Sequence, residues 1–80
     1  MERKELAVKL IDFCIENRIF NTSTQIGRMR SRIERQLDDL AFVEYLIHML
    51  ITKAKYKEGV DFKKLRELLE ELEKIRLDLE

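Results

Sequence analysis

The sequence predicts an all-α protein, and three observations lead to this prediction. The 80 residues include no proline and only two glycines, so few residues interrupt a helix. Apolar residues recur at spacings of three and four, and no segment shows the alternation of a half-buried strand. Turn-like residues gather only at 21–24 and 57–60. The chain is therefore expected to form a single helical domain over residues 1–80.

The first helix is expected at about residues 3–20. Leu6, Leu10 and Phe13 form its central apolar stripe. Asn21 is a good candidate for the left-handed residue just past the helix end. Thr22 then caps the next helix, and Gln25 three residues later completes a capping box.

The middle of the chain, about residues 23–57, is expected to form one long helix. An apolar heptad repeat keeps its phase throughout this segment. Its a positions are Ile26, Ile33, Leu40, Ile47 and Ala54, and its d positions are Met29, Gln36, Val43 and Leu50. Either Asp38 or Asp39 can instead cap a new helix, which would give an up-down-up-down four-helix bundle. Only Gln36 interrupts the apolar seam, and the repeat keeps its phase past Asp38 and Asp39, which favours the long helix and hence an antiparallel bundle of three helices.

The last helix is expected at about residues 61–79. Asp61 is its predicted N-cap, and Val60 and Leu65 can form a hydrophobic staple around it. Its acidic residues are interpreted as a solvated face, paired with basic residues at i and i+4, such as Lys63 with Glu67.

The long helix predicts a homodimer. Between residues 37 and 51 its apolar residues spread around most of the helix, and one antiparallel neighbour cannot cover them all. A second protomer can cover the remainder. The expected interface consists of apolar residues near the centre of the long helix: Leu40, Phe42, Val43, Leu46, Ile47 and Leu50.

A local basic segment is the strongest candidate for a ligand site. The chain as a whole has a formal net charge of zero, so no global field attracts polyanions. Arg28, Arg32 and Arg35, however, are spaced to share one helix face, and Glu34 is the only acid nearby. Such a stripe can follow a phosphate backbone, with Thr24 and Ser31 as further donors. The simpler interpretation is a solvated or paired face. Lysines at 53, 55 and 57 complement the helix dipole.

No residue constellation indicates catalysis. His48 has Glu44 one turn earlier, but the pair lacks the further ligands of a metal site and the nucleophile of a triad. Cys14 lies on an apolar stripe, where burial would make it unreactive. The protein is therefore expected not to be an enzyme and to use no cofactor, metal or small-molecule substrate.

The sequence thus predicts a homodimeric helical bundle that acts as an interaction adaptor or regulatory scaffold for an unidentified protein. The alternative is a nucleic-acid-binding regulator that uses Arg28, Arg32 and Arg35. The lone cysteine and the lack of a signal-peptide pattern predict a cytoplasmic location, and no apolar run predicts a membrane span. Abundant Lys, Arg and Glu with few Asn and Gln is typical of a thermophile.

Overall fold

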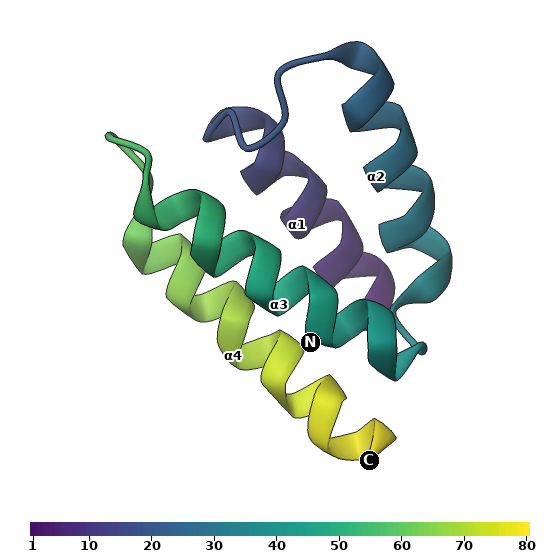
Figure 1. Cartoon of the computed structure of the whole chain (residues 1–80). Coiled ribbons are helices and arrows are strands. Elements are labelled where there is room, and N and C mark those ends of the chain that lie inside the picture. The colour runs from purple at the N-terminus through teal and green to yellow at the C-terminus, as the bar shows by residue number, and fades with distance from the viewer.

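The computed structural model describes all 80 residues and contains four helices and no strands. These are α1 (Arg3–Glu16), α2 (Ser23–Gln36), α3 (Leu40–Lys55) and α4 (Phe62–Leu79). They form two hairpins, α1–α2 and α3–α4, which the short turn at residues 37–39 joins (Figure 1). α1 also packs against α4. The all-α class is confirmed, and the four-helix alternative fits the number of helices.

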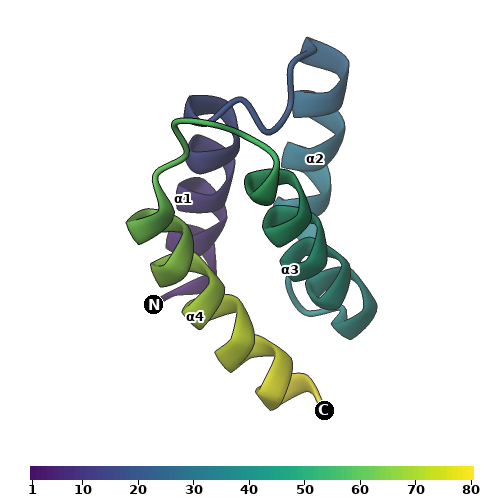
Figure 2. The same cartoon turned by 60° about the vertical axis from the view of Figure 1, so that its left-hand side comes forward.

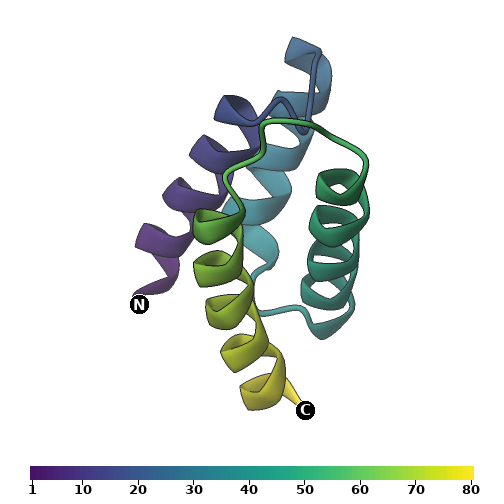
Figure 3. The same cartoon turned by 90° about the vertical axis from the view of Figure 1, so that its left-hand side faces the viewer.

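The loops within the two hairpins lie at the same end of the bundle, and the turn between the hairpins lies at the other end (Figures 2 and 3). From that turn α2 and α3 diverge (Figure 1). The two hairpins are instead held together by packing of α1 against α4.

The prediction of one long helix over residues 23–57 is wrong, because the chain breaks at Asp39. The backbone of Asp39 is extended, with φ −99° and ψ 113°, and its carboxylate accepts a hydrogen bond from the amide of Phe42 at 3.3 Å. Asp39 is therefore an N-cap rather than a residue within a helix. Folding back at this point lets other helices of the same chain cover the apolar side of α3, which a straight helix would leave exposed to water.

α1 ends at Glu16, earlier than the predicted residue 20. Arg18, not Asn21, adopts the left-handed conformation, with φ 54°. The amide of Ile19 donates to the carbonyl of Cys14 at 2.9 Å, and that of Arg18 donates to Ile15 at 3.2 Å. These two bonds are those of a Schellman motif. The motif places Ile19 in the core, where it is 1% exposed, so burial of Ile19 explains why the helix ends early.

The side chain of Asn17 ties α1 to the start of α4. Its Nδ2 donates to the carbonyl of Phe13 at 3.0 Å, and its Oδ1 accepts from the amide of Asp61 at 2.9 Å. Nearby, Gly59 has φ 75°, a conformation that other residues adopt only with strain. The loop before α4 is thus fixed at both of these points.

Both predicted N-caps are confirmed. The hydroxyl of Thr22 accepts from the amide of Gln25 at 3.1 Å, and the carboxylate of Asp61 accepts from the amide of Lys64 at 3.0 Å. The Gln25 side chain accepts from the amide of Asn21 at 3.3 Å, one residue before the partner expected in a capping box.

The core is one cluster of 21 apolar residues, and no polar or charged residue is buried. It contains four of the six residues predicted at a dimer interface, namely Phe42, Val43, Leu46 and Leu50. The other two, Leu40 and Ile47, are partly buried. The premise that α3 needs a second protomer to cover it is therefore wrong, since the chain covers these side chains itself.

Candidate functional site

The main candidate site is the α2 arginine face, which we define as Arg28, Arg32 and Arg35. All three side chains are exposed, and they lie on the side of α2 away from the buried residues Met29 and Ile33. None of them takes part in an ion pair. The ion pairs of the molecule instead involve residues of α1, α4 and the two chain ends. The positive charge of α2 therefore has no carboxylate partner within the chain.

Two aromatic residues of α3 hold Arg32 in place. Its Cζ lies 4.6 Å from the ring centroid of Phe42 and 5.3 Å from that of Tyr45. Its Nε donates to Oε1 of Gln36 at 3.4 Å. Cation–π contacts of this kind orient the guanidinium without neutralising it.

Sequence reasoning missed these aromatic partners of Arg32. In an unbroken helix, Arg32 and Tyr45 would lie about 20 Å apart along the axis. Only the break at Asp39 turns α3 back far enough to bring Tyr45 beside α2. No local sequence signal could have indicated this contact, because it depends on the direction in which α3 leaves the turn.

The other two arginines of the face differ in their contacts. Nη2 of Arg35 donates to Oγ of Ser31 at 2.6 Å, and its Nε donates to the carbonyl of Ser31 at 3.3 Å. These bonds hold Arg35 against its own helix. Arg28 makes no side-chain hydrogen bond or ion pair. Thr24, the second predicted donor, is exposed in the first turn of α2.

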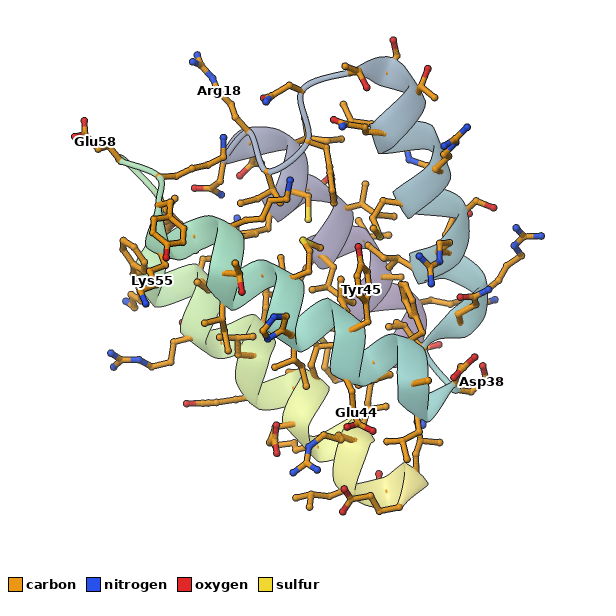
Figure 4. The ribbon with its side chains drawn as sticks, in the orientation of Figure 1. Arg18, Asp38, Glu44, Tyr45, Lys55 and Glu58 are labelled. Atoms are coloured by element: carbon orange, nitrogen blue, oxygen red, sulfur yellow. The ribbon has the colours of Figure 1, made fainter.

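Tyr45 extends this face onto α3. Its side chain lies on the side of α3 toward α2, whereas Glu44 points toward α4 and Asp38 lies at the turn (Figure 4). Tyr45 is 45% exposed. Two turns further along α3, Nζ of Lys53 lies 5.7 Å from the ring centroid of Phe20. Arg32 on α2, Tyr45 on α3 and Lys53 further along α3 therefore form one series of cationic and aromatic side chains.

The acidic residues of α2, α3 and the turn between them point away from Tyr45 or lie at that turn (Figure 4). Residues 23–56 contain six Lys or Arg and four Asp or Glu. Asp38 and Asp39 lie at the turn, and Glu34 lines the groove between α1 and α2, as does Arg35. Lys55 lies near the far end of α3, its Nζ 5.7 Å from the ring centroid of Tyr56. Arg28, Arg32 and Lys53 thus have no acidic side chain within ion-pair distance and lie away from the groove.

A second feature is a groove of about 530 Å³ between α1 and α2. Its apolar lining consists of Ala7, Val8, Ile11 and Leu37, and its charged lining consists of Arg3, Lys4, Glu34, Arg35 and Asp38. Val8, on the α1 side of this groove, is 58% exposed. Arg3 donates to the carbonyl of Leu37 at 3.4 Å beside this groove. Both signs of charge line the groove, so it does not select for one of them.

The remaining candidate residues are not brought together. His48 is exposed and makes no hydrogen bond or ion pair with Glu44. No group of three or more His, Cys, Asp or Glu side chains is arranged to hold a metal ion. Burial raises the pKa of the Cys14 thiol to about 12, so the thiol is neutral and a poor nucleophile at neutral pH.

The particular i, i+4 pairs predicted within α4 do not form, although Arg76 and Glu80 do pair at that spacing. Lys63, for example, makes no ion pair with Glu67. Arg76 instead bridges Glu73 and Glu80, and Lys74 pairs with Glu71 at 3.6 Å. The hydrogen bond from Arg76 lowers the pKa of Glu73 below its ordinary value.

None of the four helices is both long enough and apolar enough to cross a membrane. Comparison with protein-family models, curated proteins and solved structures gives no match for this chain.

Proposed function

We propose that this protein is a non-enzymatic nucleic-acid-binding protein whose α2 arginine face contacts phosphates. One observation carries the proposal: the four arginines of α2 are exposed and make no ion pair. The sequence favoured a protein-interaction adaptor because of the apolar surface on α3. Most of that surface belongs to the core, so the nucleic-acid alternative has the better support.

The spacing of the arginines fits a phosphate backbone. Arg28 and Arg35 are seven residues apart, which is about 10 Å along a helix axis. One strand of a duplex advances 3.4 Å per nucleotide, so the face spans about three nucleotides. Like charges at i and i+4 weaken a helix slightly. Bound phosphates would relieve this repulsion between Arg28 and Arg32 and would release counterions.

A salt titration tests the proposal. Binding of a labelled oligonucleotide is followed by fluorescence anisotropy between about 50 and 200 mM salt, the range over which phosphate contacts weaken steeply. The wild-type affinity is expected to fall with salt. In the variant Arg28→Gln, Arg32→Gln, Arg35→Gln, the slope of log K against log salt is expected to decrease by about 2 to 3.

The matched control removes three cations from α4: Lys63→Gln, Arg66→Gln and Lys74→Gln. It changes the net charge by the same amount but leaves α2 intact, so binding is expected to fall much less. Absence of binding at about 50 mM salt, where phosphate contacts are strong, would overturn the proposal. Equal weakening by both triple variants would also overturn it, because binding would then follow net charge alone.

A second candidate function is self-association through the groove between α1 and α2. It is favoured by the exposure of Val8 and of Ile15, which is 40% exposed on the same helix. A second copy of the chain would cover both side chains. Light scattering at low and high salt is expected to give a dimer mass for the wild type and a monomer mass for Val8→Glu. Leu77→Glu, at an equally exposed position on α4, is the control. A wild-type monomer at all concentrations would exclude this function.

A further inference from the structure

We infer that the face formed by α2 and α3 selects single-stranded nucleic acid and that an unpaired base stacks on Tyr45. The inference deepens the proposed function and depends on it. Its basis is the position of one partly exposed aromatic ring among cations that have no acidic partner.

Contacts with Phe42 and Arg32 hold the Tyr45 ring in position. Phe42 is only 2% exposed, and its ring centroid lies 6.2 Å from that of Tyr45, with the two planes at 32°. Arg32 contacts both rings, at 4.6 and 5.3 Å. A buried ring and a guanidinium therefore limit the motion of Tyr45. A ring fixed before binding loses little conformational freedom when a ligand stacks on it.

The cations near Tyr45 lie on α2 and α3, the two helices that diverge from the turn at residues 37–39 (Figure 1). Arg32 contacts the ring and is followed by Arg28 one turn away on α2, and Lys53 lies two turns along α3. A strand that passes over Tyr45 would thus meet Arg32 at the ring and further positive charge along either helix, away from the turn. This combination of a basic path and an aromatic platform is typical of surfaces that bind single strands.

The surface is poorly suited to reading a duplex. Bases within a duplex present only their edges, so stacking on Tyr45 would require unstacking a base pair, which is unfavourable. In a single strand the base faces are free, and every base has one, so stacking gives affinity without strong sequence preference. The preference should therefore be for strandedness rather than for sequence.

The test compares a single strand with its duplex, using the full chain and oligonucleotides of about 20 nucleotides, long enough for the site sizes of single-strand binders. The single strand is expected to bind about tenfold tighter or more. Tyr45→Ala should bind the single strand about tenfold more weakly than the wild type, which is within the range measured for loss of one stacked base. Tyr45→Phe should retain it, because the ring is kept.

Tyr56→Ala is the matched control. Tyr56 lies just past the end of α3 and is 78% exposed, but Lys55 rather than an α2 arginine is beside it. Its removal is expected to leave the affinity unchanged. Circular dichroism of each variant separates loss of binding from loss of fold.

A direct readout of stacking is also available. The chain has no tryptophan and two tyrosines, so Tyr45 is the only tyrosine in the Tyr56→Phe variant. Its fluorescence is expected to be quenched by a thymine single strand and not by a duplex at the same phosphate concentration.

The outcomes separate this inference from the proposed function. Equal or tighter binding of the duplex, together with no effect of Tyr45→Ala, would overturn base stacking. The proposed function would still stand in that case, provided that the triple arginine variant lost binding. Failure to bind either form would overturn both.

Discussion

α2 and α4 are both exposed amphipathic helices, but they differ in how many of their charged side chains form ion pairs. α4 carries five basic and five acidic residues, and Arg76, Lys74 and Lys64 all make ion pairs. α2 carries four basic residues and one acidic residue, and none of them is paired. Half of the charged residues of α4 are thus paired within the chain, whereas those of α2 are all left to solvent or to a ligand.

The two helices also contribute differently to the core. α4 buries Leu65, Leu68, Leu72 and Ile75, whereas α2 buries only Met29 and Ile33. The stability of α2 therefore depends more on its N-cap than that of α4 does. The solvent-facing side of α2 is also less constrained by packing. α4 therefore contributes mainly to the core, whereas the exposed arginines of α2 are not required by the core and are the residues to test for function.

The largest expected effect is on core packing. Leu72 is fully buried, so Leu72→Ala should lower the free energy of unfolding by about 3 kcal/mol. Met29→Ala on α2 should lower it by less, because Met29 lies nearer the surface at 8% exposure. Urea denaturation measures both. Equal losses would contradict the idea that α2 is the less firmly packed helix.

The next effect concerns the cap of α2. Thr22→Ala removes the acceptor for the amide of Gln25 and should cost about 1 kcal/mol. Because α2 buries few residues, its first turn should fray, and amide hydrogen exchange there should accelerate. Unchanged protection of these amides would show that packing against α1 is enough to hold the turn.

A smaller effect on stability is expected from replacing an unpaired arginine than from replacing a paired one. Arg28→Gln removes a like-charge neighbour of Arg32 and should raise stability by a few tenths of a kcal/mol at low salt, or leave it unchanged. Arg76→Gln breaks contacts with Glu73 and Glu80 and should lower the melting temperature. Thermal melts at low salt compare the two. A larger loss for Arg28→Gln would mean that the fold needs the α2 charge after all.

The smallest effect is a dependence on acid pH. Since the hydrogen bond from Arg76 lowers the pKa of Glu73 in the folded state, the unfolded chain takes up this proton more readily. The contribution of Glu73 is therefore present at neutral pH and is lost as the pH falls below about 4.3, the ordinary glutamate value. The melting temperature of Glu73→Gln should fall less steeply there. Parallel curves would show that Glu73 gains nothing from Arg76.

Features that depend on neighbouring residues could be predicted from the sequence. The caps at Thr22 and Asp61 are examples, because each side chain bonds to an amide three residues away. The apolar spacing likewise identified helices throughout the chain. The shared face of Arg28, Arg32 and Arg35 follows from the same helical spacing, although their function stays a prediction.

Features decided by distant packing could not be predicted. The heptad repeat is compatible both with one straight helix and with a break at Asp39. The break is favoured because it lets the rest of the chain bury the apolar residues of α3. Asn21 is chemically suited to a left-handed turn, yet burial of Ile19 places that turn at Arg18. Tyr45 joins the candidate site for the same reason, since its neighbours come from another helix.

The break at Asp39 has a topological consequence. Two hairpins joined by three residues form a fold whose halves can be exchanged between chains. If residues 37–39 became helical, the α1–α2 hairpin of one chain could pack on the α3–α4 hairpin of another and bury the same side chains. The Asp39→Ala variant should therefore form more of the exchanged dimer than the wild type does, seen as a larger species in size-exclusion chromatography. The hydrogen bond from the Phe42 amide to Asp39 thus helps to keep each chain folded on itself.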